Sequence, residues 1–328
     1  MRYYDTTYTS GVIAVREKNL LKEKILRFCE LGAEDAFRAL LESGFGGGAE
    51  NASNVYEYEN LIAAEEMRLD AFIREYAPTE TEKAFLLSPR DFHNAKALLK
   101  AAYLGADVGR LLAPEGLIKI SLLSECVENK DFSPLASLNA RLCGACEAGS
   151  ELLEENPSGA KLGEIFENAQ YLYLSDLAKK RTALRKILAA KGDMTNILIA
   201  FRAENAENAK GKYLPVGTLT PEMLEKLFLE DKDKVREAFK NTRYAEFVKS
   251  CLDAVEKHLP MTEAEKIAAV YDVEFFDVKK YELKKEEPFL YYVYRRRAEN
   301  ANVRIVFACL LAGMGEHEIK KRLRRCER

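Results

Sequence analysis

The sequence has 328 residues, of which 48% are apolar and 31% are charged, and its formal net charge is −3. This composition excludes an intrinsically disordered chain, and the near-neutral charge does not indicate any one class of partner. The length is sufficient for two or three compact units, each with its own core.

Nothing in the sequence indicates export or membrane insertion. Residues 1–16 mix tyrosines, threonines and an acid without an apolar core, so they do not resemble a secretory signal. The longest stretch without a charged or amide side chain, Ile305–Gly315, is about half as long as a membrane crossing requires. We therefore expect a cytoplasmic protein that is held at a membrane, if at all, by another protein.

The cysteines are expected to be reduced thiols, since there are seven of them and no export signal. Cys143 and Cys146 have the spacing of a zinc half-site, but a second pair of ligands at short spacing is missing. The three histidines are far apart in the sequence and lie in no catalytic motif. The sequence therefore predicts no catalytic residue, no bound metal and no cofactor.

Start signals for helices follow one another along the chain. The glycine-rich segment 44–48 lacks the Lys-Ser/Thr ending of a phosphate-binding loop, and we expect it to be a flexible connection. Ser88-Pro89, Thr220-Pro221 and Thr262 each predict a helix start, and apolar residues recur after them at three and four positions. The strand-like segment Pro288–Tyr294 leads directly into a helical pattern and is interpreted as helix. The prediction is an all-α fold.

Two patterns occur three times each, in the same order. The first is an apolar residue, a second one five positions later and an Asp four positions after that, at Leu26/Leu31/Asp35, Leu122/Val127/Asp131 and Leu224/Leu229/Asp233. The second is an acid followed three residues later by asparagine, at Asp91/Asn94, Asp193/Asn196 and Glu299/Asn302. The common register of the two patterns indicates a triplicated chain.

A period near 100 residues is too long for a solenoid repeat and fits three helical bundles. We place the three similar domains at residues 1–112, 113–214 and 215–328. In each, the acid and the asparagine share one helix face and can satisfy backbone groups of a neighbouring helix end. We interpret these six residues as structural, because an active site is seldom needed three times.

Four stretches carry a resemblance to a known family. They are the opening helix Gly11–Leu21, the segment Leu40–Phe45, the segment Asp91–Leu99 beginning Asp-Phe-His-Asn, and the final segment from Glu299 through Asn302, Arg304 and Gly313 to Leu323. In this order they resemble the C subunit of archaeal and bacterial V/A-type ATPases, whose eukaryotic V-ATPase counterpart is the d subunit. The central part, 143–168, shows little resemblance.

The resemblance implies three similar helical bundles in a pseudo-threefold funnel. It implies a non-catalytic central-stalk subunit that couples the shaft, formed by the D and F subunits, to the membrane proteolipid ring for proton or sodium transport. The protein would be peripheral to the membrane through the ring, with no nucleic acid and no small-molecule ligand as partners.

The C-terminal segment 295–328 is basic, with ten Lys and Arg residues against four Glu. Three interpretations remain open: a solvated helix face, a contact with the ring or nearby headgroups that would include Arg322, Arg324 and Arg325, or a nucleic-acid patch. The alternative function is therefore a free-standing helical adaptor that binds protein or RNA through this basic end.

Overall fold

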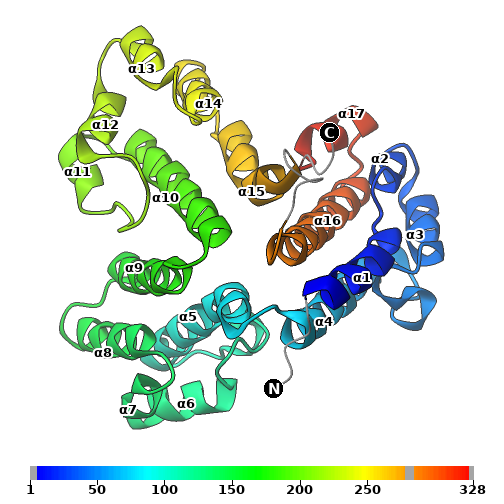
Figure 1. The fold of residues 1–328 in the computed structure, drawn as a ribbon, viewed down its shortest axis with the longest axis horizontal. Helices are drawn as coiled ribbons and strands as arrows, with labels where there is room; N and C mark the ends of the chain where they lie inside the picture. Colours follow the sequence, from blue (N-terminus) through cyan, green and yellow to red (C-terminus); the bar gives the residue numbers. More distant parts are fainter. Residues whose placement is uncertain (1–5, 278–283, 325–328) are drawn as a thin grey trace. The chain divides into compact units, whose positions relative to one another are not determined.

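The computed structural model describes residues 6–277 and 284–324, and within these ranges it contains helices and no β-strand (Figure 1). The predicted all-α fold is confirmed. The chain forms two compact units, one made of residues 1–83 and 265–328 and the other of residues 84–264. The three predicted domains and their funnel arrangement stay a prediction.

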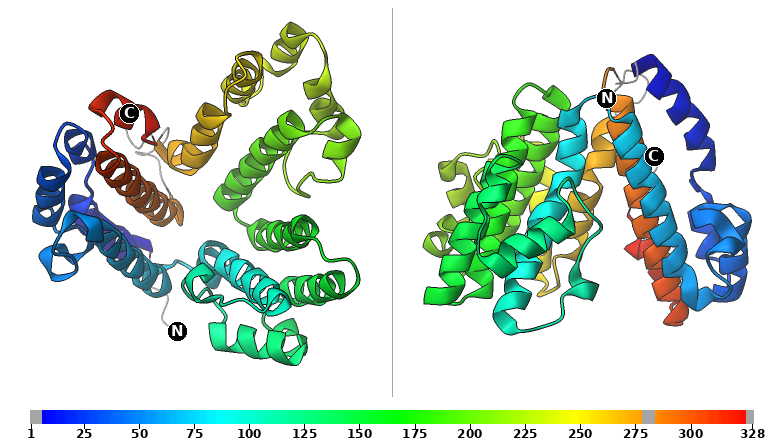
Figure 2. Two further views of the ribbon diagram at one scale, coloured as in Figure 1. Left: turned by 180° about the vertical axis from the view of Figure 1, so that it is seen from behind. Right: turned by 90° about the horizontal axis from the view of Figure 1, so that it is seen from below.

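The first unit joins the two ends of the chain. Its long helices α4 and α16 lie side by side and antiparallel, and α1 runs along α16 (Figure 2). Its elements are α1 (Thr6–Arg16), η1 (Glu17–Asn19), α2 (Lys24–Phe28), α3 (Ala33–Glu42), η2 (Phe45–Glu50), η3 (Val55–Glu57), α4 (Tyr58–Tyr76), most of α15 (Thr262–Asp277), α16 (Glu287–Leu311) and α17 (Glu316–Arg322).

The second unit is a succession of helix pairs, among which α8 and α9 pack together most extensively (Figure 1). Its elements are α5 (Glu80–Leu104), η4 (Gly109–Leu111), α6 (Ile120–Asn129), α7 (Ser133–Ala136), α8 (Ala140–Glu155), α9 (Gly159–Ala178), α10 (Thr182–Arg202), α11 (Ala206–Lys210), α12 (Pro221–Glu225), η5 (Lys226–Phe228), α13 (Lys232–Phe239) and α14 (Ala245–Glu256). The first turn of α5 belongs to the first unit.

Aromatic residues hold α1, α4 and α16 together in the first unit. Phe72 on α4 stacks on Phe289 at 5.5 Å and meets the edge of Tyr292 at 4.9 Å between ring centroids. The guanidinium of Arg16 lies over the Phe72 ring at 4.9 Å. Aromatic pairs of this geometry contribute about 0.5–1.5 kcal/mol beyond the area that they bury. Helix α1 therefore packs against the α4–α16 pair, with Arg16 over the Phe72 ring.

Two of the three predicted helix starts are confirmed and one is wrong. Thr220 caps α12, accepting a hydrogen bond from the Met223 N–H at 3.3 Å, and α15 begins at Thr262. Ser88 and Pro89, however, lie inside α5, which begins at Glu80. The helix passes through Pro89 although a proline removes one backbone hydrogen bond. The apolar residues of the preceding turns, 84–87, are all buried, and this burial favours the longer helix.

The glycine-rich segment is a packed element, which differs from the flexible connection that we expected. Phe45, Gly46 and Gly48 are buried in η2, and Gly46, with φ of +60°, lies directly against the backbone of Leu61 in α4. A β-carbon at Gly46 would approach the Leu61 Cα to 2.6 Å. The glycines therefore serve a close approach of two backbones.

Six of the seven cysteines are free and buried, as expected for structural thiols, and Cys326 lies outside the described residues. Burial raises the pKa of Cys29 to about 11 and those of Cys146 and Cys251 to about 12. These thiols therefore stay protonated near neutral pH and are poor nucleophiles. None of the described helices is long and apolar enough to cross a membrane.

Candidate functional site: three backbone clamps and a buried ion network

The three acid–asparagine pairs lie at matching depths in three long helices. Helix α5 begins 11 positions before Asp91, α10 begins 11 before Asp193, and α16 begins 12 before Glu299. All six side chains are buried, with at most 5% of their surface exposed. Buried polar groups of this kind destabilise a fold unless they find hydrogen-bond partners. Each pair must therefore be matched by groups from another segment.

Each asparagine forms two reciprocal hydrogen bonds with one backbone residue, and Asn196 Nδ2 also donates to the Val216 carbonyl at 3.5 Å. Ala113 donates its N–H to Asn94 Oδ1 at 2.8 Å, and Asn94 Nδ2 donates to the Ala113 carbonyl at 3.1 Å. Asn196 pairs in the same way with Leu214, at 2.7 and 3.3 Å. Asn302 pairs with Arg324, both bonds being 2.8 Å. Each carboxamide thus binds the backbone of a later segment, which runs back past the helix that carries the asparagine.

The acids accept backbone N–H groups that lie just before the next helix. Leu117 and Ile118 donate to Asp91 Oδ1 at 3.0 and 3.1 Å, immediately before α6. Thr218 and Leu219 donate to Asp193 Oδ1 at 2.7 and 2.9 Å, shortly before α12. Asp193 Oδ2 also accepts from the hydroxyls of Thr218 and Tyr244. We call an acid, its asparagine and the backbone that they hold a backbone clamp.

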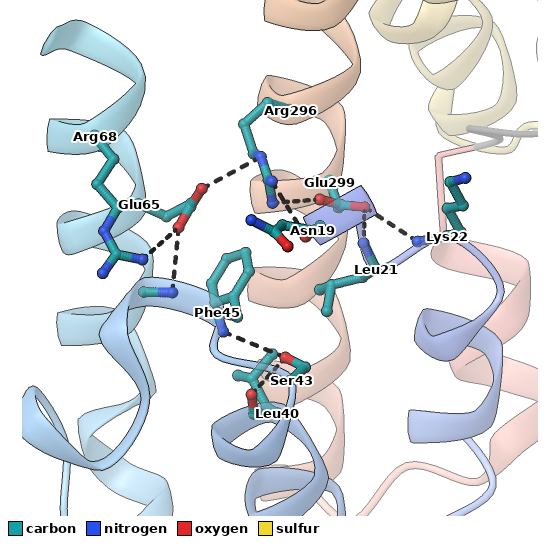
Figure 3. A network of polar contacts seen from close by, with 11 residues as sticks. Asn19, Leu21, Lys22, Leu40, Ser43, Phe45, Glu65, Arg68, Arg296 and Glu299 are labelled. Carbon is teal, nitrogen blue, oxygen red and sulfur yellow. Dashed lines mark hydrogen bonds and ion pairs between the residues drawn. The ribbon is translucent and has the colours of Figure 1, made fainter. Parts of the chain in front are cut away.

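The third clamp is completed by the opposite end of the chain. Leu21 and Lys22 donate their N–H groups to Glu299 Oε1 at 2.6 and 3.2 Å, just before α2 (Figure 3). Leu21 lies five positions before Leu26, as Leu117 lies before Leu122 and Leu219 before Leu224. Residues 21–22 therefore have the same place in the third clamp as residues 117–118 have in the first and 218–219 in the second.

Sequence reasoning missed this closure, although a signal for it was present. Leu122 follows Asp91 by 31 positions and Leu224 follows Asp193 by 31, whereas Leu26, in the remaining copy of the first pattern, precedes all three acid–asparagine pairs. The structure brings this remaining copy together with the remaining pair, at Glu299.

Two glycines, also missed from the sequence, allow the short aspartates to reach the backbone. They belong to a Pro-x-Gly motif that occurs at Pro114–Gly116 and again at Pro215–Gly217. A β-carbon at Gly116 would lie 2.6 Å from Asp91 Cγ and 2.8 Å from the Leu87 carbonyl oxygen. In the third clamp the residue before the two donor N–H groups is Leu20 rather than a glycine. The Glu299 side chain is longer than that of aspartate by one methylene and reaches these donors without a glycine.

Gly116→Ala is expected to lower the free energy of unfolding by about 1–3 kcal/mol, because the new methyl group overlaps the Asp91 carboxylate. Gly144→Ala is the matched control, since Gly144 is helical and has open space around it. It should raise stability by about 0.5–1 kcal/mol. Urea unfolding followed by circular dichroism measures both. Equal effects of the two substitutions would contradict the proposed close approach.

A buried ion network surrounds the third clamp. Arg296, 3% exposed, lies between two buried carboxylates: its Nη1 donates to Glu299 Oε2 at 2.7 Å, and its Nε is 3.3 Å from Glu65 Oε1 (Figure 3). Arg296 Nη2 also donates to the Asn19 carbonyl at 3.2 Å. Glu65 Oε2 accepts from the Gly46 N–H at 3.2 Å. The network thus connects η1, η2, α4 and α16.

Burial raises the pKa of the Glu299 carboxyl, while Arg296 and the N–H groups of Lys22 and Leu21 act in the opposite direction. Taking a carboxylate out of water disfavours its charged form. Among the groups that favour the ionised form of Glu299, Arg296 has the strongest influence.

The aspartates of the first sequence pattern lie at helix starts, and several of its apolar residues lie outside the core. Asp35 and Asp233 lie in the first turns of α3 and α13, and Asp131 accepts the N–H of Ser133 at the start of α7. Acids at these positions interact favourably with the helix dipole. Among the apolar members, Leu26, Leu31 and Leu229 are exposed, so this pattern does not trace a buried stripe.

The basic C-terminal segment is largely partnered by acids. Arg304 forms ion pairs with Glu59 and Glu66, Lys320 with Glu30 and Glu316, and Lys321 with Glu318. Of the three predicted interface residues, Arg322 is exposed, Arg324 takes part in the third clamp through its backbone, and Arg325 lies outside the described residues. Among the described residues, therefore, nothing specifically favours a nucleic-acid patch.

No group of three or more His, Cys, Asp or Glu residues in the described ranges could hold a metal ion. The arrangement at the six signature residues joins backbone to side chain, and their role as structural staples stays a prediction. Through these hydrogen bonds, each long helix is connected to the backbone segment that leads into the next group of helices.

One comparison with known proteins decides the family. The family described as ATP synthase (C/AC39) subunit matches residues 9–322. The chain belongs to this family. The match includes all three acid–asparagine pairs and the N-terminal segment that closes the third clamp, and it confirms the resemblance seen in the sequence to the C subunit of V/A-type ATPases. No match to a curated protein was found.

Proposed function

We propose that this C/AC39 family member is the non-catalytic central-stalk subunit of a V/A-type rotary ATPase. It would couple the shaft of the D and F subunits to the membrane proteolipid ring and would be peripheral to the membrane through that ring. The observation that carries the proposal is the family match over residues 9–322. A protein that only couples two others needs no catalytic group of its own.

The three clamps and the ion network support a torque-bearing role. A protein that passes rotation must resist shear between neighbouring helices, and non-directional apolar contacts resist sliding less well than directed hydrogen bonds do. Each clamp fixes the register of a long helix against the following segment through buried, directed bonds. In the third clamp the two ends of the chain are locked in the same way.

The experiment that tests this function is co-expression with the D and F subunits from the same source, followed by size-exclusion chromatography. We expect one peak that contains all three proteins and has no ATPase activity. Reversing the charge of Arg322, Arg324 and Arg325 should leave this peak almost intact and at most weaken seating on the ring. Elution of the chain alone, at concentrations that assemble D with F, would contradict the proposal.

A further inference from the structure

The three equivalent helices α5, α10 and α16 differ in the charge at their N-termini. The first turn of α5 carries Glu80 and Glu82, and that of α16 carries Glu287. The first turn of α10 carries no acid. Acids are favoured at helix N-termini because they interact with the positive end of the helix dipole. Helix α10 lacks this interaction.

Cations surround the start of α10 instead. Between Asp176 and Asp193 the chain has six basic residues and no acid: Lys179, Lys180, Arg181, Arg185, Lys186 and Lys191. Arg181 occupies the N-cap position and makes no side-chain capping hydrogen bond. Cations at this end of a helix repel both the dipole and one another. The arrangement therefore opposes folding, whereas at α16 the neighbouring Lys284 and Lys285 are accompanied by Glu286 and Glu287.

Much of this charge faces solvent. Lys180, Arg185 and Lys186 are exposed and have no acidic partner within the described part of the chain. Lys179 is exposed and pairs with Asp176 at 2.7 Å. We call Lys179, Lys180, Arg185 and Lys186 the α9–α10 basic cluster (Figure 1 shows the short turn between the two helices).

We infer that the α9–α10 basic cluster binds the anionic headgroups of a phospholipid membrane. The large apolar side chains of α10 around it, Leu184, Ile187 and Leu188, are buried, and the exposed Leu138 lies three residues before Arg141, which pairs with Asp176. A specific protein interface has an apolar or aromatic core, which this single leucine does not supply. A headgroup layer requires only exposed cations, each of which adds attraction to an anionic surface.

The family favours a membrane over another polyanion, since an ATP synthase works at a membrane. The contact is additional to the binding of shaft and ring in the proposed function. It is weak, because four cations without an apolar anchor give reversible electrostatic binding. It would orient or pre-concentrate the chain at the membrane, and assembly with the other subunits would hold it there.

Sedimentation with vesicles of phosphatidylglycerol and phosphatidylcholine tests the inference on the isolated full chain. We expect binding that weakens as salt is raised and is lost on pure phosphatidylcholine vesicles. Lys180→Gln, Arg185→Gln and Lys186→Gln together should lower the partition coefficient at least about tenfold, since each cation contributes roughly fivefold. The fold of this variant is checked by circular dichroism, and its melting temperature should be unchanged or higher.

The matched control removes three other exposed lysines of the same unit, in Lys212→Gln, Lys226→Gln and Lys249→Gln. It has the same net charge as the test variant, and its binding should change less than about twofold. Equal loss in both variants, or no binding of the unsubstituted chain, would overturn the inference. The inference would also be overturned if a duplex DNA oligonucleotide displaced the chain from vesicles and bound it through the same three residues. That result would assign the cluster to nucleic acid.

Discussion

Arg296→Met is expected to lower the free energy of unfolding by about 3–5 kcal/mol, the usual cost of leaving a buried charge without its partner. Two buried carboxylates, Glu65 and Glu299, lose their common cation in this variant, and Glu65 keeps only its ion pair with the exposed Arg68 side chain at 3.5 Å. Both still accept backbone N–H groups, so neither can turn to solvent without breaking a hydrogen bond. Urea unfolding near neutral pH measures the loss.

The triple variant Glu65→Gln, Arg296→Met, Glu299→Gln is the control. It removes all three charges and keeps a carbonyl oxygen for the Gly46 and Leu21 N–H groups. Replacing a whole buried ion network is often neutral, so most of the stability should return. If the triple variant is as unstable as Arg296→Met, the arginine acts through the packing of its stem rather than through its charge.

The loss caused by Arg296→Met should also depend on pH. Burial raises the pKa of Glu299 above its unfolded value, and removal of Arg296 takes away the strongest opposing influence. A carboxyl whose pKa is higher in the folded state than in the unfolded state favours folding while it is protonated. This stabilisation is lost as the pH rises through the folded-state pKa. The difference between Arg296→Met and the unsubstituted chain should therefore be smaller at about pH 5 than at about pH 7.5.

Asp193→Ala is expected to cost about 2–4 kcal/mol, because two backbone N–H groups and two hydroxyls lose their acceptor. Tyr244→Phe is the matched comparison, since it removes one of these four donors and should cost about 0.5–1.5 kcal/mol. Burial and the hydrogen bond to Asp193 raise the pKa of Tyr244, so this hydroxyl stays a donor at neutral pH. A loss for Asp193→Ala no larger than that for Tyr244→Phe would mean that water satisfies the released backbone groups.

The helical fold could be predicted from sequence, and the six signature residues could be singled out there, because both depend on local spacing. Helical periodicity and the i, i+3 relation are visible in a single chain. The start of α5 could not be placed, because a capping signal at Ser88 competes with burial of the preceding turns, which only tertiary packing reveals. The packed role of the glycines at 44–48 was hidden for the same reason.

The ion network could not be predicted at all. Glu65 and Arg296 are 231 positions apart, and each is an ordinary charged residue of a helix in the sequence. Their pairing depends on how α4 and α16 pack, and charge alone does not encode it. The spacing between Asp91 and the Pro-x-Gly motif, in contrast, was readable, since the same motif recurs after Asp193.

The closure of the third clamp has a consequence for how the protein is made on the ribosome. The backbone partners of Asp91 and Asp193 emerge within 26 or 27 residues of each acid, so the first two clamps can form while the chain is still growing. Leu21 must wait for Glu299, 278 residues later, which takes roughly 15–60 s at usual elongation rates. During that time the apolar side chains of the N-terminal helices that pack against α16 and α17 stay exposed. The first unit can therefore fold completely only after these two C-terminal helices have been synthesised.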